Sequence, residues 1–252
     1  MRKTCPIAAA FLWGAGAASS LLIGGLLVMW RPIGERTIGL IMAFGAGVLI
    51  SGVAFELIAP AITEAESGGH WKVALGLGAG ALTFYLGDAY IDHMGGDKRK
   101  SSKGGGGSAL ALTLGIVLDG IPESIALGLT LLGGEGVSAA FLAAVFLSNL
   151  PEAIGATSGF QKSGRSNRWV IGLWISIILV SGVSALVGYA LLENASGTAV
   201  AVVDAFAAGA ILTMLADTMM PEAFERGGRE VGLLTTLGFA LAVGIAVWEH
   251  VG

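Results

Sequence analysis

Two related stretches of this sequence carry residues that could bind a cation. Residues 118–125 read LDGIPESI, and residues 147–154, which begin 29 positions later, read LSNLPEAI. Each stretch places a Pro-Glu pair near the middle of a long apolar segment. An acidic side chain at the centre of a bilayer costs about 2.5–3.5 kcal/mol on insertion scales. Two such glutamates therefore indicate that a cation, a proton or water compensates them.

The spacing within each stretch favours a cation site. Asp119 and Glu123 are four residues apart and share a helix face, while Ser148 and Asn149 precede Glu152 by four and three residues. One antiparallel pair of helices could bring these three carboxylates, one amide and one hydroxyl to a single point. We predict that these five residues form the metal site.

The prolines add oxygen ligands to this prediction. Pro122 and Pro151 lack an amide hydrogen, so the carbonyls of Leu118 and Leu147 lose their helical partners. Unpaired carbonyls at membrane depth are tolerated where they line a wet cavity or coordinate a cation. The pattern predicts an oxygen-rich pocket at a pair of broken helices. The alternative is a pair of kinked helices whose glutamates are protonated and hydrogen-bonded between helices.

The elements that must position these residues are membrane-spanning helices. The mean hydropathy is +0.80, and 54% of the residues are apolar while 13% are charged. The apolar residues form blocks long enough to cross a hydrocarbon core of about 30 Å. We predict an all-α membrane protein with eight transmembrane helices, of which the fourth and fifth are central. The eight segments are 7–30, 37–60, 71–91, 109–132, 137–160, 169–191, 198–220 and 231–248.

The chain reads as one integral membrane domain. Residues 1–92 hold three helices, residues 93–108 form a flexible cytoplasmic loop rich in Gly, Ser and Lys, and residues 109–252 hold five helices. Of the 14 Lys and Arg residues, all but Arg2, Lys3 and Lys72 fall in the odd connections. This bias predicts that the odd connections are cytoplasmic and that both termini lie outside. We expect a multi-pass protein of the plasma or inner membrane. The first apolar run is longer than a signal-peptide core, so we expect an uncleaved helix, with a cleaved signal as the alternative.

Several other classes of protein are disfavoured by composition. Cys5 is the sole cysteine, which excludes an internal disulfide and a thiolate metal cluster. No basic cluster indicates a nucleic-acid partner. No His lies at membrane depth and no nucleophile stands beside a plausible base, so we do not expect an enzyme or a permanently bound cofactor.

Along nearly its whole length, the sequence resembles the ZIP family of divalent-metal transporters. Residues 119–124 (DGIPES) look like the family's His-Asn-x-Pro-Glu-Gly motif, and residues 148–153 (SNLPEA) look like its Gln-Asn-x-Pro-Glu-Gly motif. Residues 205–210, with the following Asp217 and Pro221, are similar to the family's seventh helix. Residues 45–47 (GAG) are similar to its second helix.

The resemblance implies transport of a divalent metal such as zinc, manganese or iron towards the cytoplasm. It also implies eight helices, an elevator-like motion of helices one, four, five and six, and often a homodimer. Glu123 and Glu152 match the family's bridging carboxylates, and Asn149 matches its amide position.

Departures from the family motif change the expected metal. Asp119 stands where the family usually has a ligating His, and Ser148 stands where it has Gln or His. Residues 181–185 contain no acidic residue where some members have a second-site glutamate. Imidazole suits zinc, whereas carboxylate and carbonyl oxygens suit harder ions. We therefore expect one all-oxygen site that favours Mn²⁺ or Fe²⁺.

Acidic residues outside the motifs are candidates for the pathway of the cation. Glu56 could guide cations inward, although its position also suits a solvated helix terminus, and Asp217 could act as an exit or gating carboxylate. The pair Glu64 and Glu66 could concentrate cations or belong to a solvated turn, and we expect Asp204 to lie at the membrane interface.

Two other functions stay open. One is a transport-inactive relative that binds a cation for a structural or sensing role. The other is proton-coupled transport of another small solute, with the two motif glutamates relaying protons.

Overall fold

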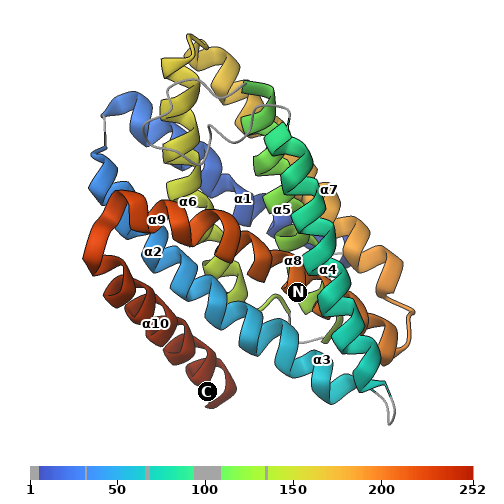
Figure 1. Cartoon of the computed structure of the whole chain (residues 1–252). Coiled ribbons are helices and arrows are strands. Elements are labelled where there is room, and N and C mark those ends of the chain that lie inside the picture. The colour runs from blue at the N-terminus through green and yellow to red at the C-terminus, as the bar shows by residue number, and fades with distance from the viewer. Residues whose placement is uncertain (1–5, 32, 66–68, 94–108, 134–135, 252) are drawn as a thin grey trace.

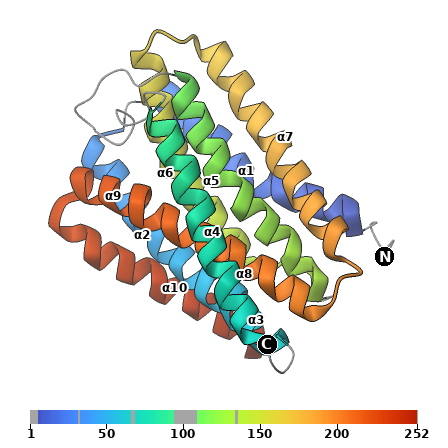
Figure 2. The same cartoon turned by 45° about the vertical axis from the view of Figure 1, so that its right-hand side comes forward.

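The computed structural model describes residues 6–31, 33–65, 69–93, 109–133 and 136–251. Within these ranges all regular structure is helical, and the helices form one bundle (Figures 1 and 2). Of the predicted cytoplasmic loop 93–108, residues 94–108 lie outside the described residues.

Eight long helices and six shorter turns follow one another along the described chain. The long helices are α1 (Pro6–Trp30), α2 (Glu35–Gly52), α4 (His70–Ile91), α5 (Ala109–Thr130), α6 (Ala139–Lys162), α7 (Asn167–Leu192), α8 (Gly197–Met214) and α10 (Val231–Val251). The shorter ones are η1 (Val53–Ile58), α3 (Ala59–Glu64), η4 (Leu131–Gly133), η5 (Leu215–Met219), α9 (Met220–Gly227) and η6 (Gly228–Glu230).

Six helical stretches of the described chain are long and apolar enough to cross a membrane. They are Pro6–Trp30, Glu35–Glu64, Leu112–Gly133, Ala139–Lys162, Asn167–Leu192 and the 52-residue stretch Gly197–Trp248. The last stretch contains two of the predicted segments, 198–220 and 231–248. Segment 71–91, which is α4, is outside this set because its glycines, two tyrosines and Asp88 lower its hydropathy. The prediction of an all-α membrane protein is therefore confirmed, whereas the count of eight spans is not.

The helices pack as two groups. In the first group, α1 packs along α6 and α7, and α5 packs along α7. In the second group, α2 packs along α10 and α9, and α4 packs along α8. Glycines permit these close approaches, as small residues do between membrane helices. For example, a Cβ added to Gly188 of α7 would lie 3.1 Å from the Ile125 carbonyl oxygen of α5.

The two groups meet at the helices that carry the Pro-Glu motifs. The main contacts between the groups run from α2 to α6 and from α5 to α8. Figure 2 shows α5 between α7 of the first group and α4 of the second group. The motifs therefore lie at the boundary between two packed units.

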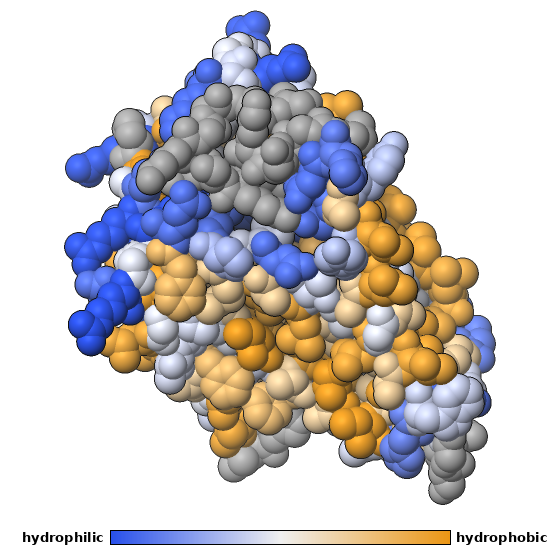
Figure 3. Space-filling view, in the orientation of Figure 1, coloured by the Kyte–Doolittle hydropathy of each residue, from blue (hydrophilic) through white to orange (hydrophobic). Residues whose placement is uncertain are grey.

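The outward faces of the helices are apolar. Large hydrophobic side chains are exposed on α4, α7 and α10, among them Leu82, Leu179 and Leu237. Figure 3 shows such residues over the middle and lower part of one face, while hydrophilic residues gather at its upper end. An apolar exterior of this kind suits a hydrocarbon solvent.

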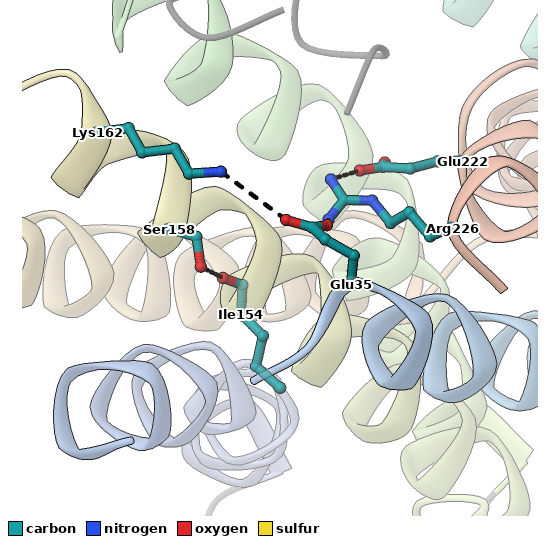
Figure 4. Close-up of polar contacts among 6 residues, drawn as sticks. All are labelled: Glu35, Ile154, Ser158, Lys162, Glu222 and Arg226. Carbon is teal, nitrogen blue, oxygen red and sulfur yellow. Dashed lines mark hydrogen bonds and ion pairs between the residues drawn. The ribbon is translucent and has the colours of Figure 1, made fainter. Parts of the chain in front are cut away.

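Ion pairs join three of the predicted odd connections. Glu35, at the start of α2, pairs with Lys162 of α6 at 3.8 Å and with Arg226 of α9 (Figure 4). Arg36 pairs with Glu230 of η6 at 2.6 Å. Connections 31–36, 162–168 and 226–230 therefore lie at one end of the bundle, as alternating crossings of a membrane predict.

Candidate metal site

The two motif helices run without a break through their prolines. Pro122 lies inside α5, and Pro151 lies inside α6. The Ser138 side chain caps the start of α6 by accepting a hydrogen bond from the Phe141 amide at 3.1 Å. The prediction of a broken-helix pair is wrong. Each proline removes one backbone hydrogen bond, but packing against neighbouring helices keeps the α-helix intact.

The predicted site residues point into the bundle. Asp119, Glu123, Ser148 and Asn149 are buried, and Glu123 is only 2% exposed. Glu152 is partly buried. None of these five side chains is exposed on the outer surface of the bundle.

One contact joins the two motifs directly. The Ser148 Oγ donates to Glu123 Oε1 at 3.4 Å, although it also lies 3.0 Å from the Val145 carbonyl oxygen. A hydroxyl has one proton, so it can serve only one of these acceptors at a time. Glu123 Oε2 is buried and has no hydrogen-bond partner among the described residues. The Glu123 carboxylate is therefore short of polar partners among the described residues.

Two neighbouring helices press their backbones against the motif of α6. A Cβ added to Gly24 of α1 would lie 2.6 Å from the Leu150 carbonyl oxygen. A Cβ added to Gly45 of α2 would lie 3.0 Å from the Leu147 carbonyl oxygen, the one that Pro151 leaves without its usual helical donor. This freed carbonyl therefore lies in the contact between α2 and α6, inside the bundle.

Coordination of one metal ion by all five predicted ligands stays a prediction. Among the described residues, no group of three or more His, Cys, Asp or Glu side chains lies close enough to hold a metal ion. The structure brings Glu123 and Ser148 together across the two helices, and it buries Asp119 and Asn149 in the same turns.

Both predicted pathway residues lie in π-helical turns. Glu56 lies in η1 and Asp217 lies in η5, and each precedes a proline, Pro60 or Pro221, by four residues. Because proline cannot donate to the carbonyl four residues earlier, the helix widens locally instead of ending. Glu56 is partly buried, whereas Asp217 is exposed. The sequence contained the signal for these turns, a proline inside an apolar segment, but not their π geometry.

A cavity of about 790 Å³ opens at the end of the bundle opposite the ion pairs. It is lined by the ends of α3, α5 and α7, the start of α8 and the segment before α6. Four acidic residues line it: Glu56, Glu64, Glu193 and Asp204. Asp204 is 6% exposed, and its expected position at the membrane interface stays a prediction. We did not predict the gathering of these four residues, since they come from two stretches of the chain, 56–64 and 193–204, that lie far apart in the sequence.

A nearly buried arginine lies at the other end of the motif region. The Arg226 side chain is 10% exposed and pairs with Glu222 at 2.5 Å and with Glu35 (Figure 4). A Cβ added to Gly155, three residues after Glu152, would lie 3.8 Å from an Arg226 guanidinium nitrogen. From sequence Arg226 served only as a topology signal. The structure places its positive charge beside the motif helix.

Comparison with known proteins gives one informative similarity. No family model matches the chain. Over 233 residues, 91% of its length, the chain is 24% identical to an Arabidopsis thaliana protein described as "Putative zinc transporter At3g08650". The chain spans 37% of the length of that relative. The similarity supports a zinc-transporter-like relationship, and membership of the ZIP family stays a prediction.

Proposed function

We propose that this chain transports a divalent metal cation across a membrane, towards the side that carries the Lys- and Arg-rich connections. The observation that carries the proposal is the contact between the two Pro-Glu motifs, in which the 2%-exposed Glu123 meets Ser148 of the neighbouring helix. The similarity to a protein named as a zinc transporter supports the same broad role.

The chemistry of Glu123 favours a cation as its partner. Removing a carboxylate from water costs several kcal/mol unless an opposite charge and hydrogen bonds compensate it. One shared hydroxyl is weak compensation, and Glu123 Oε2 has no hydrogen bond within the described chain. A divalent ion passing through α5 and α6 would supply the missing charge with oxygen ligands on both helices.

The packing suggests how the ion could cross. The motif helices belong to the group α1, α5, α6 and α7, which meets the second group along α2 and α8. Sliding of the first group against the second would carry a bound ion from one end of the bundle to the other. This is the elevator-like motion that the resemblance implies, with the homodimer as a further prediction.

The expected cargo is a hard or borderline ion. Asp119 and Ser148 provide oxygen where an imidazole would favour zinc. We propose that this chain prefers Mn²⁺ or Fe²⁺ over Zn²⁺. The name of the Arabidopsis protein refers to zinc, but that name describes the relative and does not set the cargo of this chain.

Uptake by proteoliposomes tests the proposal. The purified chain in liposomes containing a metal-sensitive dye should take up Mn²⁺ faster than protein-free liposomes. A protein that only binds a cation would gain thermal stability from Mn²⁺ without any flux, and that result would favour the transport-inactive alternative. No flux and no stabilisation by Mn²⁺, Fe²⁺ or Zn²⁺ would reject both functions.

A further inference from the structure

The cavity at the end of the bundle opposite the ion pairs has an unusually one-sided charge. Glu56, Glu64, Glu193 and Asp204 line it, and among the described residues its wall contains no Lys, Arg or His. These carboxylates come from η1, α3, the α7–α8 connection and α8. Low-dielectric walls lined by one sign of charge focus the field and concentrate counter-ions.

Asp204 is the residue that points to a bound ligand. Its side chain is 6% exposed and it faces the cavity. Within the described part of the chain, it makes no hydrogen bond or ion pair, and its one electrostatic neighbour is the like-charged Glu64. A buried carboxylate beside a second carboxylate needs a cation or a proton to compensate it, and the open cavity in front of Asp204 gives a cation access to it.

The size of the cavity leaves room for a hydrated ion. No three acidic side chains of the described chain lie close enough to coordinate one metal directly. A hexahydrated ion needs about 200 Å³, counting six waters of about 30 Å³ each, and the cavity offers about 790 Å³. A small hard ion such as Mg²⁺ releases its water reluctantly and usually keeps several waters when it binds a protein.

We infer that this cavity is a second cation site, in which Asp204 and Glu64 hold a hydrated divalent cation through its water shell. The cavity wall reaches Thr130 at the end of α5. Seven residues of helix separate Thr130 from Glu123, a rise of about 10 Å at 1.5 Å per residue. The site would bind hydrated cations about 10 Å from the motif and deliver them to it. Only this delivery role rests on the proposed function.

An ion that cannot lose its ligands tests the inference. Hexaamminecobalt(III) has the size and shape of a hexahydrated cation, but it does not exchange its ammonia ligands, so it binds only from outside that shell. Its binding to the purified full chain in phosphatidylcholine nanodiscs can be measured by equilibrium dialysis. We expect Asp204→Asn and Glu64→Gln each to weaken binding at least tenfold. Glu230→Gln, the same loss of charge at the opposite end, should leave binding unchanged.

Further variants separate this site from the motif and from misfolding. Asp204→Glu should restore most of the binding, and Glu123→Gln should bind hexaamminecobalt(III) like wild type. Equal binding by wild type and Asp204→Asn would overturn the inference, as would loss of binding in Glu123→Gln alone. Dialysis measures binding and does not require transport. The binding result can therefore be interpreted even if the chain transports no metal.

Discussion

Among the described residues, Glu123 is the most deeply buried ionisable group, at 2% exposed. The spacing of the motif predicted both this residue and Ser148 as site members, and the structure places them in contact across two helices. What spacing could not give is the shortage of hydrogen bonds at the carboxylate, which depends on how α1, α2 and α7 fill the space around the motif. This shortage is the physical reason to expect a cation there.

The identity of residue 119 should set the preference between metals. Asp119→His introduces an imidazole at a buried position one turn from Glu123, and imidazole suits zinc better than a carboxylate does. We expect the ratio of Zn²⁺ to Mn²⁺ uptake to rise severalfold. Competition between the two ions in proteoliposomes measures this ratio.

Asp119→Asn is the matched control for that exchange. It removes the same charge without adding imidazole, so it should lower uptake of both ions and leave their ratio close to wild type. A wild-type protein that already prefers zinc strongly over manganese would contradict the all-oxygen assignment.

At the scale of elements, the sequence located the helices better than it located their irregularities. A proline in an apolar segment predicts a lost hydrogen bond, but neighbouring helices decide whether the helix breaks, continues or widens. In α5 and α6 the helix continues, while before Pro60 and Pro221 it widens into the π turns that hold Glu56 and Asp217. The burial of Asp204 was likewise not predicted, because its distance from a helix end does not reveal that α3 and α4 pack over that end of α8.

The close contact between α2 and α6 should make Gly45 sensitive to an added side chain. In Gly45→Ala the new methyl would lie 3.0 Å from the Leu147 carbonyl oxygen and 3.2 Å from the Ser148 Cα. Overpacking of this kind costs about 1–3 kcal/mol. We expect a lower melting temperature and slower Mn²⁺ uptake, measured on the same purified protein.

Gly78→Ala on α4 provides the comparison. No atom outside its own helix lies within 4 Å of a Cβ added there. Alanine is favoured over glycine in a helix by about 1 kcal/mol, so this variant should be as stable as wild type or slightly more stable. Equal effects of the two substitutions would mean that α2 does not press on the motif.

At the scale of the whole molecule, two packed groups of helices meet along α2–α6 and α5–α8. The Lys and Arg pattern predicted that the odd connections share one end, and the pairs Glu35–Lys162 and Arg36–Glu230 join three of them. The pattern could not predict which helices pack into each group, because apolar segments of similar composition do not indicate which other helices they will contact. Which side of the membrane this end faces stays a prediction.

Cross-linking the groups should stop transport if one slides against the other. Lys162 and Glu35 belong to different groups, on α6 and α2, and their charged atoms are 3.8 Å apart. In a Cys5→Ser background, Lys162→Cys with Glu35→Cys joined by a short thiol cross-linker should abolish Mn²⁺ uptake, and reduction of a cleavable linker should restore it.

The pair Arg36→Cys with Glu230→Cys serves as the control, since both residues lie in the second group. Its cross-link should leave uptake near the wild-type rate. Full activity with the 35–162 link in place would exclude relative motion of the two groups as the transport step.

The measurement that tests the central claim most directly is Mn²⁺ uptake by Glu123→Gln in proteoliposomes, beside Glu230→Gln as a control with the same chemical change at an exposed site. We expect uptake by Glu123→Gln to fall to the rate of protein-free liposomes while its melting temperature stays equal or rises, because an uncompensated buried charge has been removed. The control should transport like wild type. Wild-type uptake by a folded Glu123→Gln protein would contradict the account.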